Sequence, residues 1–505
     1  MTETASPYAA LENRFARIAR IDDALGILHW DYETTMPEGA APTRAETLAT
    51  LDVLRHDLLV DPQVADWLDA ADAGADVGLD EWQRANLREM RRAWRHAIAV
   101  PGDLVEASRR AEATCEMAWR RARAEDDFAG LLPSLSEVLN LQRQVAEAKA
   151  AAFGCDKYDA LLDAYEPGGR AARIDALFAD LADFLPGFTD EVLEAQARAP
   201  DPVRPIGHFP IDRQRGLGRE LMQAIGFDFD HGRLDVSAHP FCGGGLSDVR
   251  ITTRYDEGDF TRSLMGVMHE TGHALYEQGR PAGWLAQPVG QARGMAAHES
   301  QSLLVEMQTA RSRPFLEYLA PLVRDTFGGD GPAWTADNLY RLYTRVERSL
   351  IRVDADEVTY PAHIILRFRL ERAMIGGDLK LADLPGAWAE GMRALVGVVP
   401  PNDALGCLQD IHWPGGGWGY FPTYTLGALA AAQLFEAARQ DGSEIEAGIG
   451  HGNFGPLVDW LRSHVHGHGS RPENGDALLE EATGRPLDTG AFKRHLNRRY
   501  VERAW

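Results

Sequence analysis

Cysteine, basic charge and long apolar runs are all scarce in this sequence of 505 residues. Its four cysteines are scattered and form no CxxC pair, so we expect free thiols, and neither a disulfide framework nor a zinc ribbon. The 52 lysines and arginines stand against 76 aspartates and glutamates, for a formal net charge of −24. That charge disfavours binding to nucleic acid and to anionic membranes.

The apolar segments are too short to span a bilayer, and the first residues lack the pattern of a signal peptide. We therefore expect a cytoplasmic protein with no membrane partner. What the sequence does contain is helical apolar spacing over most of its length. Helices are predicted over 6–29, 43–57, 80–98, 102–125, 130–152, 171–195, 212–225, 259–278, 296–326, 335–373 and 383–396.

One segment predicts a sheet, and another divides the chain. Residues 248–255 alternate between apolar and polar, which indicates a strand, and the glycines at 243–245 indicate its turn. The Pro-rich stretch at about 196–211 interrupts the helical pattern. We predict that it connects a helical N-terminal part, about 1–195, with a catalytic part, about 212–505.

The sequence HETGH at 269–273 carries the clearest chemical signal. Residues four apart share one face of a helix, so His269 and His273 can both reach one metal ion. Glu270 is rotated by about 100° and lies beside the metal, where it can take a proton from an activated water. Asp259 is a plausible N-cap for this helix, and Gly279 is a plausible stop.

A catalytic zinc needs a third protein ligand. Glu277, one turn after His273, is excluded, because ligands at 269, 273 and 277 would span about 12 Å of helix axis. The remaining candidates, Glu299 and Glu306, share the next predicted helix with His298. We choose Glu299, since it lies near the start of that helix, 26 residues after His273, and keep Glu306 as the second choice.

Further motifs accompany the zinc helix. They are His239-Pro240-Phe241, Asp248-Val249-Arg250-Ile251-Thr252, His298-Glu299-Ser300, Ile351-Arg352 with Ala355-Asp356, GCLQDIHW at 406–413, GWGYFPTYTLG at 417–427, and WDYETTMPEGAAPTRAE at 30–46. Together, in consistent order over nearly the whole chain, they resemble the M32 metallocarboxypeptidases, the carboxypeptidase Taq family.

The resemblance implies a single peptidase unit over 1–505 that is mainly α. Its fold would be the neurolysin-like helical zinc-peptidase fold, with a deep cleft and a small antiparallel β-sheet near the metal. Members release single residues from the free C-termini of peptides with broad specificity and are usually homodimers. They bind one Zn²⁺ per chain, and Co²⁺ is able to substitute for it. The family's ligands fall on His269, His273 and Glu299, and its general base falls on Glu270.

The substrate's terminal carboxylate needs a cationic partner, for which Arg352 is the first choice and Arg250 the second. Either arginine could instead form an internal ion pair, with Asp248 or Asp356 as possible partners. His239 either lines the cleft from the sheet or is a buried, hydrogen-bonded histidine.

The aromatic loop at 401–423, with Tyr424 directly after it, offers three candidate donors to the oxyanion, His412, Tyr420 and Tyr424; we expect one of the tyrosines, and the sequence does not say which. Each tyrosine could equally serve in packing. The tract HVHGHG, with His464, His466 and His468, resembles a metal site, but it follows a helical pattern and we discount it.

Two other functions remain open. An oligopeptidase that cuts internally would use the same zinc chemistry, and only the resemblance and the carboxylate partner favour removal of the last residue. A non-catalytic helical scaffold with a structural zinc is disfavoured, because such sites usually have four protein ligands and give Glu270 no role.

Overall fold

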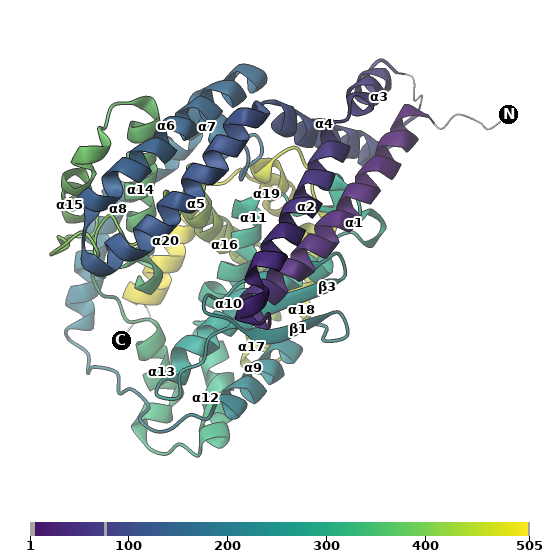
Figure 1. Cartoon of the computed structure of the whole chain (residues 1–505). Coiled ribbons are helices and arrows are strands. Elements are labelled where there is room, and N and C mark those ends of the chain that lie inside the picture. The colour runs from purple at the N-terminus through teal and green to yellow at the C-terminus, as the bar shows by residue number, and fades with distance from the viewer. Residues whose placement is uncertain (1–5, 75–77, 503–505) are drawn as a thin grey trace. The chain divides into compact units, whose positions relative to one another are not determined.

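Helices form most of the computed structural model, which describes residues 6–74 and 78–502 (Figure 1). The chain divides into two compact units, each built from three separate segments. The first unit combines Met1–Ala97, Pro202–Tyr343 and Ala430–Leu487, and the second combines Ile98–Asp201, Thr344–Leu429 and Asp488–Trp505. Of the helices in the described ranges, none has the length and apolar character needed to cross a membrane.

The first unit contains the three strands and most of the helices. Its helices are α1 (Pro7–Thr34), α2 (Ala41–Val60), α3 (Pro62–Asp72), α4 (Glu81–Ile98), α9 (Ile211–Ile225), α10 (Phe260–Gly279), α11 (Met295–Leu303), α12 (Arg313–Phe327), α13 (Ala336–Tyr343), α17 (Ile445–Gly450), α18 (Gly455–His464) and α19 (Gly475–Thr483). The sequence pattern did not predict the short helix α3.

The regular secondary structure of the second unit, within the described residues, is helical. Its helices are α5 (Gly102–Glu125), α6 (Phe128–Phe153), α7 (Lys157–Leu162), α8 (Ala171–Gln196), α14 (Tyr360–Gly376), α15 (Leu384–Leu395) and α20 (Gly490–Leu496). The boundary between the units falls within α16 (Pro422–Asp441) and again at Asp201–Pro202, inside the Pro-rich segment. That segment carries no helix between α8 and α9.

The small sheet is mixed, so the expectation of an antiparallel sheet was wrong in part. Strands β1 (Gly232–Val236), β2 (Cys242–Gly245) and β3 (Asp248–Thr253) lie in the order β1-β3-β2. The hairpin partners β2 and β3 are antiparallel, whereas β1 is parallel to β3. Strand β3 lies between its two partners and runs in the same direction as β1.

The sheet packs against α10, the helix that carries the HETGH sequence. Val249 and Ile251 of β3 belong to one buried apolar cluster with Val267 and Ala274 of α10. The side chain of Asp259 caps this helix by accepting the N–H of Thr261 at 2.9 Å. The predicted cap and the expected sheet beside the HETGH helix are therefore both confirmed.

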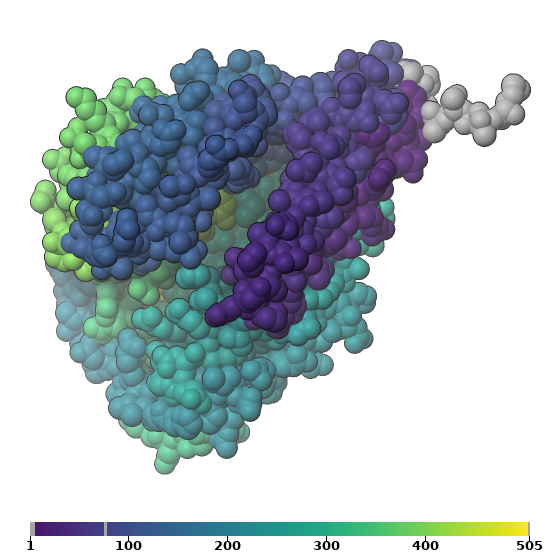
Figure 2. Space-filling view, viewed as in Figure 1, coloured from purple at the N-terminus to yellow at the C-terminus, as the bar shows by residue number. Residues whose placement is uncertain are grey.

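Helices α1 and α2 lie side by side, at the purple end of the colour scale in Figure 1, and both reach the face seen in Figure 2. Helix α1 also approaches β2 closely: a Cβ added at Gly26 would lie 2.0 Å from the carbonyl oxygen of Gly244. The glycine at this position therefore lets the helix backbone touch the strand.

The predicted helix over 335–373 was wrong in its middle. Residues 344–359 are irregular apart from one short turn between α13 and α14. The Asp356 carboxylate accepts the backbone N–H groups of Glu347, Val358 and Thr359 at 3.0 Å, in place of helical carbonyls. One side chain thus provides the acceptors that a continuous helix would have supplied.

Candidate metal centre

Helix α10 places His269 and His273 on one face, as the four-residue spacing predicts. Their imidazole centroids lie 5.0 Å apart. The helix is buried along most of its length, so the two rings are held by the core of the first unit.

Helix α11 brings Glu299 to the same place. Its Oε2 lies 3.4 Å from Nε2 of His273 and 4.0 Å from Nε2 of His269. One ligand atom from each of the three residues falls within 4.8 Å of the others. Tetrahedral coordination with bonds of about 2.1 Å separates donors by about 3.4 Å, so this donor set fits one metal ion.

Gly272 permits the close packing of α10 on α11. A Cβ at this position would lie 2.3 Å from the carbonyl oxygen of Gln301 and 2.6 Å from Cα of Ser302. The contact is with backbone, which cannot rotate away. The sequence interpretation assigned no role to Gly272, although a glycine inside a helical pattern was a signal that another backbone approaches there.

Glu306, the second choice as a ligand, lies behind His269. Its Oε2 accepts a hydrogen bond from Nδ1 of His269 at 2.9 Å, and its other oxygen pairs with Arg311. It belongs to a π-helical segment, Leu304–Ala310, that interrupts the predicted helix over 296–326. A carboxylate on Nδ1 fixes the tautomer that leaves Nε2 available to a metal.

His273 has a different partner, which the sequence did not predict. Its Nδ1 lies 2.7 Å from Nδ1 of His298, and Nε2 of His298 lies 2.8 Å from Oε1 of Glu277. Glu277 also pairs with Arg280 at 2.9 Å. Glu277, which its distance along the helix excludes as a ligand, therefore contacts His298, and His298 in turn contacts His273. The sequence did contain a signal for this contact, because His298 directly precedes the candidate ligand Glu299.

The charges around the centre favour a cation. Burial lowers the pKa of His269, but its hydrogen bond to Glu306 and the charge of Glu299 outweigh this and raise it to about 10. Burial raises the pKa of Glu306, yet Arg311 and His269 bring it down to about 2. The surrounding carboxylates thus stabilise positive charge, which either a proton or a divalent metal supplies.

Glu270 lies one residue from His269 and is buried. Burial raises its pKa to about 7, although the charge of His269 opposes the shift. Its Oε2 has no hydrogen-bond partner among the described residues. A buried carboxylate with an available oxygen beside a metal-binding group has the properties of a proton acceptor.

Arg352 lies in the second unit and pairs with Asp410, whose Oδ1 is 2.9 Å from Nη2. Asp356, the partner suggested by the sequence, instead organises the 344–359 segment. Arg367 binds the same Asp410 at 2.6 Å. Two buried guanidinium groups therefore share one carboxylate, which leaves positive charge in excess.

The three candidate oxyanion donors form one aromatic cluster in the second unit. Nε2 of His412 lies 3.4 Å from Oη of Tyr424, and the rings of Tyr420 and Tyr424 lie 5.2 Å apart, edge to face. The Arg352 guanidinium lies 4.8 Å from the centre of the Tyr424 ring. His412 and Tyr424 thus adjoin the arginine cluster.

The loop that carries these aromatics is anchored by Glu371 of α14. This fully buried carboxylate accepts hydrogen bonds from the Tyr158 hydroxyl at 2.7 Å, the Trp413 indole at 2.9 Å and the Gly419 N–H at 3.2 Å. Burial raises its pKa to about 7, although its three donors lower it.

Arg250 and His239 lie beside the sheet of the first unit. Arg250 forms the internal ion pair that the sequence left open, with Asp248 at 2.5 Å, and its guanidinium stacks 4.3 Å from the centre of the Trp30 ring. His239 is exposed, so the alternative of a buried histidine was wrong. His466, from the discounted HVHGHG tract, is buried and bonds Gln301 at 2.9 Å.

Comparison with known proteins gives matches over nearly the full length. The family model "Carboxypeptidase Taq (M32) metallopeptidase" matches residues 10–500. Thermostable carboxypeptidase 1 of Thermus thermophilus is 40% identical over 98% of this chain and 99% of its own. Carboxypeptidase 1 of Bacillus subtilis is 32% identical over 96% of each chain. Metallocarboxypeptidase 1 of Trypanosoma cruzi is 42% identical, with a TM-score of 0.96 over 98% of this chain and 99% of that one.

Proposed function

The chain belongs to the carboxypeptidase Taq (M32) metallopeptidase family, and we propose that it is a zinc-dependent carboxypeptidase that releases single residues from the free C-termini of peptides with broad specificity. The observation that carries the proposal is the convergence of His269, His273 and Glu299, with Glu270 buried beside them. The relatives support the direction of cleavage, because each bears the name of a carboxypeptidase.

Two imidazoles and one carboxylate are a typical donor set for catalytic zinc, which keeps a fourth position open. We expect one Zn²⁺ per chain, with Co²⁺ as a possible substitute. A bound ion would supply Lewis acidity, polarising the scissile carbonyl and making water more acidic. Glu306 and His298 hold the Nδ1 atoms of His269 and His273, so that both Nε2 atoms point to the donor group.

Glu270 is the general base in this proposal. Its Oε2 accepts the proton of the attacking water, and the same carboxyl then donates that proton to the leaving amine. The buried position of Glu270 supports the role, because no described residue occupies this oxygen. In a scaffold protein with a structural zinc site, this carboxylate would have no function.

Arg352 is the proposed partner of the substrate's terminal carboxylate. The excess positive charge of Arg352 and Arg367 over Asp410 supports this role, because a second carboxylate would balance it. Arg250 is the weaker candidate, since Asp248 and Trp30 already occupy its guanidinium.

His412, Tyr420 and Tyr424 remain the candidate donors to the oxyanion. The contact of His412 with Tyr424, and of Tyr424 with Arg352, favours these two over Tyr420. His239 stays a candidate contact of the substrate because its side chain is exposed. A homodimer, a deep cleft and a cytoplasmic location remain predictions.

The general base is tested with Glu270→Gln. We expect zinc content to stay at one per chain while kcat falls by about 10²- to 10⁴-fold, the usual contribution of a general base. Metal analysis and hydrolysis of one peptide give the two readouts. Glu317→Gln is the matched control, because it removes the same charge from an exposed residue of α12. Near-normal turnover in Glu270→Gln would remove the assignment.

The direction of cleavage is tested with one peptide and its C-terminally amidated twin, followed by mass spectrometry after chelation and after zinc addition. We expect zinc-dependent, stepwise loss of single residues from the free C-terminus only. Internal fragments from both peptides would establish an oligopeptidase instead. Zinc binding without cleavage of either peptide would favour the scaffold.

A further inference from the structure

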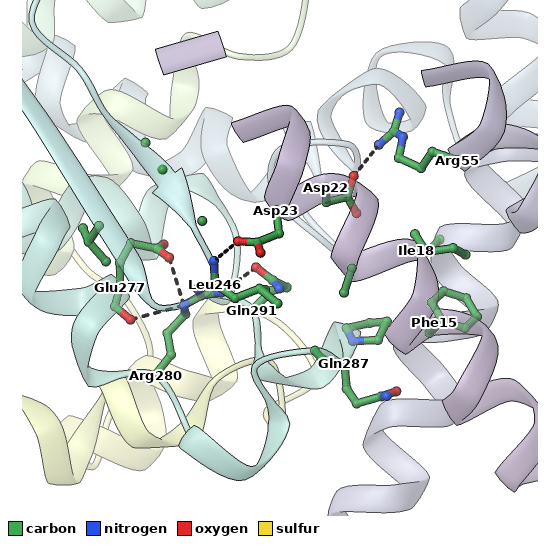
Figure 3. Close-up of a pocket in the computed structure, with 18 of the residues that line it drawn as sticks. Phe15, Ile18, Asp22, Asp23, Arg55, Leu246, Glu277, Arg280, Gln287 and Gln291 are labelled. Atoms are coloured by element: carbon green, nitrogen blue, oxygen red, sulfur yellow. Dashed lines mark hydrogen bonds and ion pairs between the residues drawn. The ribbon is translucent and has the colours of Figure 1, made fainter. Parts of the chain in front are cut away.

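A cavity of about 590 Å³ lies within the first unit (Figure 3). Its walls come from α1, α2, α4, the β2–β3 hairpin, the end of α10, and α11 with the segment that leads to it. His298 and Glu277 both line it. Since His298 bonds His273 directly, only one side chain separates the cavity from a proposed metal ligand.

The two arginines in the cavity wall are already neutralised. Arg280 is almost fully buried and pairs with Glu277 at 2.9 Å. Arg55 pairs with Asp22 at 3.3 Å and with Asp52 at 3.4 Å. Neither guanidinium therefore lacks a carboxylate, and a bound anion would find no unpaired cation here.

Asp23 is the carboxylate that has no cation. Its Oδ1 accepts the backbone N–H of Leu246 at 2.7 Å, and no ion pair joins it to any residue in the described ranges. Figure 3 shows Asp23 on α1, reaching across to the hairpin at the edge of the cavity. Its half-buried position strengthens any charge-assisted hydrogen bond that a bound cation would make.

The rest of the wall near α1 and α2 is apolar. Phe15 and Ile18 of α1 and Leu59 of α2 line the cavity, while Gly243–Gly245 of β2 contribute backbone without side chains. An apolar surface that ends at one unpaired carboxylate matches a long side chain with an apolar stem and a cationic tip. Lysine and arginine have this form.

We propose that this cavity is a substrate subsite for a lysine or arginine side chain on the N-terminal side of the cleaved bond, with Asp23 as the partner of its cation. The inference rests on the proposed peptidase function, because it takes the bound molecule to be a peptide. A carboxypeptidase substrate has one residue beyond the bond, whose carboxylate is assigned to Arg352. All other residues of such a substrate precede the bond, so the cavity beside the candidate metal centre is assigned to one of these upstream residues.

The test is a set of peptides of one sequence with a C-terminal alanine, in which lysine or its uncharged analogue norleucine occupies each upstream position in turn. Hydrolysis by the zinc-loaded protein gives kcat/KM, and fluorescence anisotropy gives peptide binding to the metal-free protein. At one upstream position we expect lysine to exceed norleucine by about 5- to 10-fold in both readouts, as one partly buried charge pair provides.

Asp23→Asn should bring this ratio to about one. Asparagine keeps an oxygen for the N–H of Leu246, so the hairpin contact survives while the charge is removed. Asp57→Asn is the matched control, because it removes the same charge from an exposed site on α2 outside the cavity. It should leave the ratio of lysine to norleucine as it is in the unmodified protein.

Hydrolysis and binding together distinguish failure of the subsite from failure of the proposed function. A ratio near one at every upstream position, or a ratio that persists in Asp23→Asn, would overturn the subsite. If no peptide is cleaved, the proposed function fails, and the binding ratio in the metal-free protein still decides whether Asp23 selects a basic side chain.

Discussion

The hydrogen bond from His269 to Glu306 leads to a measurable prediction about metal affinity. The Glu306 side chain is 12% exposed, and its Oε2 lies 2.9 Å from Nδ1 of His269. Glu306→Gln keeps an acceptor at this position but removes the negative charge behind the imidazole. Outer partners of metal-bound histidines are typically worth 10- to 100-fold in affinity. We expect the Kd for zinc to rise about 10-fold, which is about 1.4 kcal/mol.

Glu306→Ala should have the larger effect, because it also removes the hydrogen bond. We expect a rise toward 100-fold, or about 2.7 kcal/mol. Competition with a chromophoric zinc chelator at pH 7 measures both constants. Both variants also remove the carboxylate that pairs with Arg311, so stability is measured separately, by thermal unfolding in the presence of EDTA.

Glu317→Gln provides the baseline for a general loss of one negative charge. A zinc affinity of Glu306→Ala within twofold of the unmodified protein would refute the reasoning. So would an equal loss in Glu317→Gln, since the effect would then come from net charge and not from the contact with His269.

Three further predictions concern other parts of the molecule. Gly272→Ala should lower the unfolding free energy by at least about 1–3 kcal/mol and weaken zinc binding, because the added methyl meets the backbone of α11. Denaturant unfolding and zinc titration measure the two effects. An unchanged zinc affinity would count against the close packing of α10 on α11. Burial raises the pKa of Glu371 from 4.5 in the unfolded chain to about 7 in the folded protein, so the folded protein loses about 3 kcal/mol of stability as pH rises from 4.5 to 7. Glu371→Gln should lack that part of the decline when unfolding is measured against pH. Identical pH profiles for the variant and the unmodified protein would exclude this contribution of Glu371. Arg352→Lys keeps the charge opposite Asp410 but loses the guanidinium fork, so KM for a free C-terminus should rise by about 10-fold or more with little change for zinc binding; an unchanged KM would transfer the role to another residue.

The irregular segment 344–359 and the sheet illustrate what local patterns miss. The residues before α14 have helical composition, yet the chain leaves the helix because Asp356 supplies acceptors to N–H groups up to nine positions away. In the sheet, local alternation identified β3, but the parallel partner β1 depends on where β3 inserts. Neither choice is encoded by the spacing of neighbouring residues.

The candidate metal centre divides in the same way. The helix cap at Asp259 and the shared face of His269 and His273 were predictable from sequence, because helical periodicity and capping act within a few residues. The choice of Glu299 rested on its place near the start of the next helix and on the family resemblance, and the structure brings its Oε2 near both Nε2 atoms. Motif resemblance indicated the family, since many short signatures recur in one order.

Only the tertiary structure decided which groups lie behind the candidate ligands. The contact of Glu306 with His269, the chain from His273 through His298 to Glu277, and the sharing of Asp410 by two arginines join residues that are distant in sequence or chemically ambiguous there. Such contacts exist only once helices pack, because the approach of two backbones fixes which polar side chains are buried together and must satisfy one another. The sequence by itself determined the candidate ligands His269 and His273 and the helix that carries them, while packing determined their partners and charge.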